Sequence, residues 1–194
     1  MKTTSSSLKV LAGLLVFFIS LACNTIEKDA KSPTMLIIQS IMGTTSDGTA
    51  ANYLESSVTT GTSDVATITL KASLLDPNPP NGSSDYNSVT LSSYKVDYFL
   101  LDGTGTPGVT VPNSIQGSIS SLQIPVGSSE TITIIVVLDS AKLAAPLVAL
   151  AGTTNKLQVN AQITIQGQDL TGHQVETKGQ LSIIFGDYPV TTGS

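Results

Sequence analysis

Apolar and polar residues alternate with a period of two over most of the chain beyond Thr34, and this period predicts strands rather than helices. The clearest runs are residues 157–166 and 175–185, in which every second residue is apolar or small. The segment between them, 167–173, is rich in Gly, Asp and Thr, which favour turns. The two runs therefore predict a long antiparallel hairpin with one face buried and the other in water.

Shorter segments repeat the pattern and are separated by turn-forming sequences. The further predicted strands are 35–42, 66–74, 89–101, 115–124 and 132–138, with turns predicted at 76–82, 102–108 and 125–127. About seven short strands with such turns are typical of an all-β fold. We expect an immunoglobulin-like or fibronectin III-like antiparallel β-sandwich.

Residues 89–101 change phase in the middle of the run. Val89 and Leu91 share one parity, whereas Tyr94, Val96, Tyr98 and Leu100 share the other. One extra residue would turn every following side chain to the other face, so we predict a β-bulge or a strand break at Ser92-Ser93. Tyr94 and Tyr98 should then face the core.

The segment from Ser140 to Gly152 does not alternate and is rich in Ala and Leu. This composition predicts a short helical crossover between strands, with Pro146 limiting its length.

The first 22 residues have the pattern of a secretion signal. Lys2 and Lys9 carry positive charge near an apolar run, 10–22, in which Ser20 is the one polar residue. As a helix, these 13 residues would span roughly 20 Å, which is shorter than the ~30 Å hydrocarbon core of a bilayer. The length and flanks favour a signal peptide over a transmembrane helix.

Cys23, the single cysteine, follows the small residue Ala22. This junction resembles the bacterial lipoprotein signal, in which the cysteine after the cut is lipidated. The usual pattern has Leu, Val or Ile three residues before the cysteine and a small residue two before, whereas this chain has Ser20 and Leu21 there. An uncleaved anchor and an ordinary signal are the alternatives.

The resemblance implies a membrane contact through a lipid on Cys23, and Asn24 in place of Asp implies the outer membrane of the cell envelope. We expect residues 1–22 to be the signal, 23–33 a flexible tether, 34–190 the sandwich and 191–194 a tail.

Charge excludes one class of function. The 14 acidic residues outnumber nine lysines, the chain has no Arg, and removing the predicted signal leaves a net charge of −7. Nucleic-acid binding needs a basic surface, so we expect no nucleic-acid partner.

The sequence marks no catalytic or cofactor site. His173 is the sole histidine, and the GxSxG, HExxH and P-loop patterns do not occur. The four glutamates, Glu27, Glu55, Glu130 and Glu176, stand in no pattern that singles them out. We therefore expect a non-enzymatic protein without a cofactor or metal.

Two ligand-binding alternatives remain open at this stage. Loop tips of a sandwich can bind Ca²⁺ through carboxylate and carbonyl oxygens, and the candidate residues are Asp76, Asn78, Asp85, Asn87 and Asp102. Carbohydrate binding would need exposed aromatic rings, for which Tyr53, Tyr86 and Tyr188 are the candidates.

A wider resemblance supports the fold and the location. The stretch Tyr94-x-Val96-x-Tyr98-x-x-x-Asp102-Gly103, followed by Thr106-Pro-Gly-Val109-x-Val111-Pro112, resembles a group of uncharacterised bacterial lipoproteins with one immunoglobulin-like sandwich domain. Pro146-Leu147, Gly167-x-Asp169-x-x-Gly172 and Phe185-x-Asp187-Tyr188 add to it. The resemblance implies no activity. A tethered domain with few charges and no catalytic pattern leads us instead to expect a structural or protein-interaction module, with other envelope proteins as partners.

Overall fold

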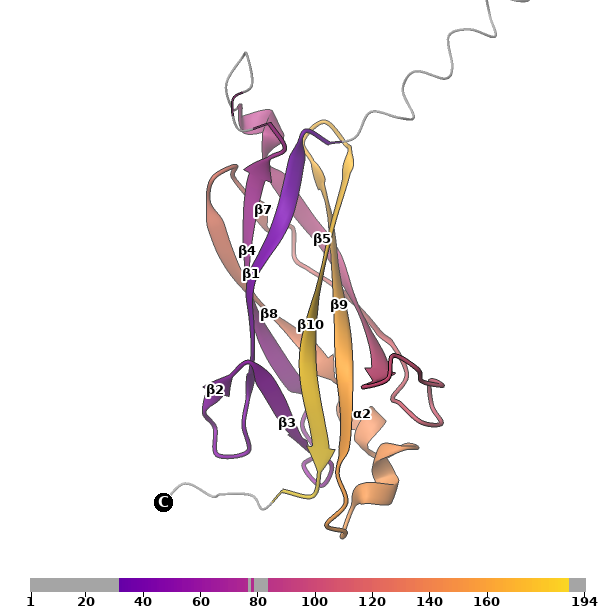
Figure 1. Ribbon diagram of the computed structural model, residues 1–194. Helices are drawn as coiled ribbons and strands as arrows, with labels where there is room; N and C mark the ends of the chain where they lie inside the picture. The colour runs from indigo at the N-terminus through magenta and orange to yellow at the C-terminus, as the bar shows by residue number, and fades with distance from the viewer. Residues whose placement is uncertain (1–31, 77, 79–83, 189–194) are drawn as a thin grey trace, which may run out of the picture. The chain divides into compact units, whose positions relative to one another are not determined.

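The computed structural model describes residues 32–76, 78 and 84–188 (Figure 1). The predicted signal, Cys23, most of the predicted tether and the tail 191–194 lie outside these residues. The elements are β1 (Thr34–Thr44), β2 (Ala50–Ala51), β3 (Tyr53–Ser57), β4 (Asp64–Leu74), η1 (Asp85–Asn87), β5 (Val89–Leu100), β6 (Ile115–Ser118), β7 (Gln123–Ile124), β8 (Ser129–Val137), α2 (Asp139–Lys142), η2 (Leu147–Leu150), β9 (Leu157–Asp169) and β10 (Gln174–Gly186). The predicted all-β sandwich with one short helical crossover is confirmed.

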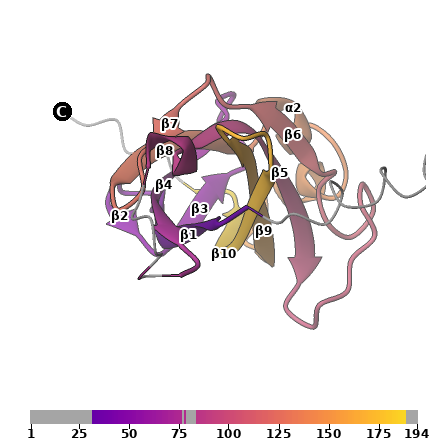
Figure 2. The same cartoon turned by 90° about the horizontal axis from the view of Figure 1, so that it is seen from above.

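The strands form two sheets. One has the order β2-β1-β4-β8, and the other has the order β3-β10-β9-β5-β6, with β7 also paired to β5. Figure 2, which looks down on the molecule, shows β1, β4 and β8 on one side and β5, β9 and β10 on the other. The predicted hairpin is the β9–β10 pair, in register from Gln168↔Gln174 to Leu157↔Phe185.

One pairing departs from the predicted antiparallel arrangement. β3 runs parallel to β10, from Tyr53↔Ser182 to Ser57↔Gly186. A tight hairpin forces its two strands to be antiparallel, but β3 follows β1 and β2 of the opposite sheet and has no hairpin with β10. Its direction is therefore set by the crossing between sheets.

The core lies between the two inner faces and is built from every second residue. Ile68 and Leu70 of β4 and Ile163 and Ile165 of β9 are fully buried members of one apolar cluster. Along one side the sheets are closed by side chains: Ile38 of β1 reaches so close to Gly179 of β10 that a Cβ there would lie 2.9 Å from its Cδ1.

The predicted phase change in β5 is a β-bulge. Leu91 pairs with Gly167 and Ser93 pairs with the next residue of β9, Gln166, so Ser92 is the extra residue. Val89 and Leu91 before the bulge and Tyr94, Val96 and Tyr98 after it are all buried, as predicted.

The crossover contains the turn α2 and the 3₁₀ turn η2, separated by the cis peptide bond Ala145–Pro146. Both turns fall within or next to the predicted segment 140–152. Lys142, at the end of α2, is buried, and its environment is described below.

Gly167 is required where β9 passes the bulge, because a Cβ at this position would lie 2.5 Å from the backbone oxygen of Thr90. We expect Gly167→Ala to lower the free energy of unfolding in urea by about 1–3 kcal/mol, since backbone must move to make room. Gly61→Ala is the matched control, because its Cβ would meet nothing within 4 Å. Equal stability of the two variants would contradict this account of the bulge.

Candidate functional site

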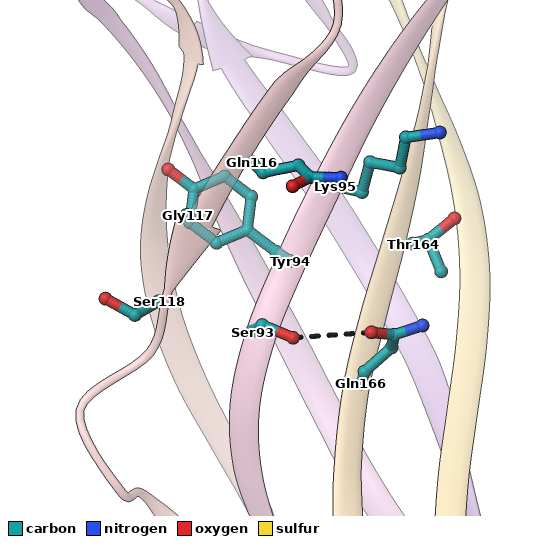
Figure 3. A pocket seen from close by; sticks show the side chains of 8 residues that line it. All are labelled: Ser93, Tyr94, Lys95, Gln116, Gly117, Ser118, Thr164 and Gln166. Atoms are coloured by element: carbon teal, nitrogen blue, oxygen red, sulfur yellow. Dashed lines mark hydrogen bonds between the residues drawn. The ribbon is translucent and has the colours of Figure 1, made fainter.

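The outer face of the β5–β6–β9 sheet carries a shallow polar depression of about 440 Å³ (Figure 3). It is lined by Ser93, Tyr94, Lys95, Gln116, Gly117, Ser118, Thr164 and Gln166. The depression lies directly after the bulge. Gly117 pairs with Tyr94, and the Tyr94 ring lies so close that a Cβ on Gly117 would be 2.3 Å from a ring carbon.

The depression offers hydrogen-bonding groups. Lys95 forms an ion pair with Asp97 at 2.9 Å, and the Ser93 hydroxyl donates to Gln166 Oε1 at 3.3 Å. The hydroxyl and amide groups of this lining can form hydrogen bonds with a polar group.

The buried Lys142 forms an ion pair and hydrogen bonds at the end of the domain that carries α2. The Lys142 ammonium lies 3.0 Å from Asp64 Oδ2 and donates to Thr60 Oγ1 at 3.0 Å and to the Thr62 carbonyl at 2.8 Å. Asp64 also accepts from the Ser56 hydroxyl at 2.6 Å. All three ammonium hydrogens have acceptors, so the charge is compensated and fastens α2 to the loop between β3 and β4.

Sequence reasoning missed this ion pair. The single signal was a lysine in an otherwise apolar crossover segment, and such a lysine more commonly extends to solvent.

Asp169 closes the β9–β10 turn from a buried position. Its Oδ1 accepts from the Thr171 hydroxyl at 2.6 Å and from the backbone N–H of Thr171 and His173, both at 2.9 Å. His173 Nδ1 lies 3.4 Å from Oδ2. His173 thus sits in the predicted turn, beside an aspartate that organises the turn.

The pKa of Asp169 is about 2, below its ordinary value of 3.8. Burial is the largest influence and raises the pKa, but hydrogen bonds from the Thr171 and Ser32 hydroxyls and from two backbone N–H groups together lower it further. The ionised carboxylate therefore stabilises the turn.

The predicted Ca²⁺ residues do not form one cluster, because Asp102 lies at the other end of the domain from the remaining four. Asp85 precedes β5 and Asp102 follows it, so a strand of 12 residues, roughly 36 Å long, separates them. Asp76 accepts from the Asn78 N–H at 2.9 Å, and Asp102 accepts from the Thr104 N–H at 2.9 Å, so each shapes its own turn. Within residues 32–76, 78 and 84–188, no group of three or more His, Cys, Asp or Glu could hold a metal ion.

The three candidate rings for carbohydrate also lie in different environments. Tyr86 in η1 is exposed, and Tyr53 is half-buried. The expectation that Tyr188 is exposed is wrong: its ring is buried with Lys156 Nζ 4.6 Å from the centroid, and burial raises its pKa to about 12. Lys156 covers the ring face that a sugar would need.

The edge strand β8 is the candidate binding feature that sequence reasoning could not locate. β8 pairs with β4 on one side, and no described strand pairs with its other side. It is nine residues long, whereas the other strands at sheet ends, β2, β3 and β6, have two, five and four. A long unpaired edge presents backbone N–H and C=O groups to an incoming strand.

No family model matches this chain, and no curated protein is similar to it. The solution structure of a protein described as late embryogenesis abundant (LEA) is similar, with 11% sequence identity, 91% of this chain and 84% of that chain covered, and a TM-score of 0.35. A likeness this weak bears on neither fold nor function. No helix in the described part of the chain is long and apolar enough to cross a membrane.

We expect Asp169→Asn to lower the free energy of unfolding at pH 7 by about 2 kcal/mol. This is the free energy that corresponds to a fall in the pKa from 3.8 to about 2 on folding. The carboxylate stabilises the fold above pH 4, and this contribution is lost as the pH falls towards 2. The difference from wild type should therefore shrink between pH 4 and pH 2 in urea unfolding. Asp85→Asn, an exposed carboxylate at the same end, is the control; a loss independent of pH would exclude the charge as the cause.

Proposed function

We propose that this chain is a non-enzymatic lipoprotein of the bacterial cell envelope, in which a lipid on Cys23 anchors a sandwich that binds other envelope proteins. The observation that carries the interaction role is the open edge of β8. A strand from a partner would extend the sheet β2-β1-β4-β8 by one, through backbone hydrogen bonds.

The backbone groups that face outward on β8 follow from its pairing with β4. The Ala72 N–H donates to the Ser128 carbonyl, which places Ala72 at a hydrogen-bonded position. In an antiparallel ladder these positions alternate, so Ile132 bonds to β4, whereas Thr131 and Thr133 turn their N–H and C=O groups outward. The contact of 3.3 Å between the Thr69 and Thr131 hydroxyls fits the closer, non-hydrogen-bonded pair.

Between Thr131 and Ile135 the edge carries neither a charged residue nor Pro, two features that block added strands in other proteins. β8 has the sequence Ser-Glu-Thr-Ile-Thr-Ile-Ile-Val-Val, with high β-propensity, no Pro and no Lys. Its register shift lies at the far end, opposite Asp64 and Val65, where the Tyr98 hydroxyl also donates to the Val136 carbonyl at 2.6 Å. The first part of the strand, from Ser129 to Thr133, therefore turns backbone groups outward while it stays in regular register with β4.

The other polar groups of the domain support a binding role over catalysis, because they hold the fold together. Asp64 and Lys142 fasten the crossover, Asp169 closes the hairpin turn, and Asp102 closes the turn after β5. The sequence from Met1 to Cys23 supports the anchor, by its resemblance to a lipoprotein signal.

Replacement of an outward N–H tests strand addition. We expect Thr133→Pro to abolish recovery of the partner when the lipidated protein is isolated from its own envelope, because Pro removes a donor and places its ring on the edge. The Thr133 N–H does not bond to β4, so the thermal midpoint should fall by only a few degrees. Thr133→Ala keeps the donor and should recover the same partner as wild type. Equal recovery with Thr133→Pro would contradict binding at this edge.

The anchor has a direct test. We expect cells fed labelled palmitate to incorporate label into the wild-type chain and none into Cys23→Ala, because the thiol is the attachment point of the lipid. Cys23→Ser is the matched control of similar size, and it should also stay unlabelled. Label in either variant at the wild-type level would reject lipidation at Cys23.

A further inference from the structure

Three exposed apolar side chains gather at the end of the sandwich where the described chain begins. They are Leu75 after β4, Tyr86 in η1 and Leu170 in the β9–β10 turn, with exposed fractions of 57%, 69% and 48%. They come from three different segments, of which the β9–β10 turn is far from the other two in the sequence. We call these three residues the tip.

Hydrogen bonds connect the tip to the first described residues. The Leu75 N–H donates to the Pro33 carbonyl at 2.8 Å, and the Thr34 hydroxyl donates to the Asn87 carbonyl, at the end of η1, at 2.9 Å. The Leu170 N–H in turn donates to the Tyr86 carbonyl at 3.3 Å. Figure 1 shows η1, the start of β1 and the β9–β10 turn at the same end.

The length of chain before Ser32 limits how far the tip can lie from a lipid on Cys23. Ser32 lies nine positions after Cys23, and even a fully extended chain of that length spans only about 30 Å. This distance is comparable to the hydrocarbon thickness of one bilayer. A lipid on Cys23 therefore keeps the tip at a high effective concentration next to the membrane surface.

We infer that the tip docks into the interface of the bilayer that holds the Cys23 lipid, an inference that rests on the lipidation proposed above. A tyrosine ring is suited to the headgroup level because it is apolar with a polar hydroxyl, and the two leucines can reach the acyl boundary.

The charges beside the tip determine which lipid headgroups it favours. Asp76 follows Leu75 and Asp85 precedes Tyr86, so two carboxylates flank the tip. Anionic headgroups repel these carboxylates, and the repulsion is strongest at low salt. The tip therefore favours zwitterionic lipids such as phosphatidylcholine or phosphatidylethanolamine.

Exposure alone does not distinguish the tip, because the opposite end also has exposed apolar residues. Val109, in the loop after β5, is 64% exposed, and Leu143, after α2, is 80% exposed. The tip differs from Val109 and Leu143 because it lies at the end where the tether joins β1. The opposite end is therefore the natural control.

The chain has no Trp, so one introduced Trp reports on a single position. We expect the indole introduced by Tyr86→Trp to be quenched by brominated phosphatidylcholine at least threefold more than the indole introduced by Val109→Trp, using the full lipidated chain in vesicles. Replacing a third of the lipid by equally brominated phosphatidylglycerol at low salt should reduce the quenching at position 86. Equal quenching at both positions, or stronger quenching at position 109, would overturn the inference.

Flotation with the vesicles separates the two proposals. A lipidated chain that floats without quenching at position 86 rejects the docked tip and leaves the anchor standing, whereas a chain that does not float rejects both. Adding Leu75→Ser and Leu170→Ser to Tyr86→Trp should at least halve the quenching without changing flotation. A blue shift in the emission of the Tyr86→Trp variant that appears without lipid and disappears on dilution would assign the tip to a second copy and overturn the inference.

Discussion

The sandwich depends on one extra residue, Ser92, in the long pairing between β5 and β9. β5 must bury Val89 and Leu91 near one end of the domain and Tyr94, Val96 and Tyr98 toward the other, although the two groups have opposite parity. Without the bulge, one of these groups would project into water and the core would lose several large side chains. The bulge in turn requires Gly167 opposite it, because β9 has no room there for a Cβ. The polar depression beside Ser93 lies directly after the bulge, so it borders the same irregularity.

Local pattern was sufficient to predict the features that one strand or one hairpin determines. Alternation placed β9, β10 and the core-facing tyrosines, and the break in alternation placed the bulge, because a side chain's face is set by its parity alone. The helical crossover was also local, since it interrupted the alternation and carried Pro146.

Features that depend on pairing between distant segments could not be predicted in this way. The parallel direction of β3 follows from a crossing between sheets, and the open edge of β8 is known only when the order of strands is known. The burial of Lys142 required its partner Asp64, which lies 78 positions earlier in the chain.

The direction of β8 places the two proposed surfaces, the β8 edge and the tip, near each other. Ser129 pairs with Lys71, close to the tether end of β4, and Val137 pairs with Asp64 at the opposite end, beside the start of α2. The open part of the edge, Ser129 to Thr133, is thus the part nearest the tip. If the tip rests in a bilayer, a partner strand must approach β8 from the side and close to the membrane surface. A large soluble partner would collide with the headgroups there, whereas an extended segment of a membrane-bound protein would be held at the right height. If both proposals hold, the geometry of the anchor selects partners that are themselves tethered to the same membrane.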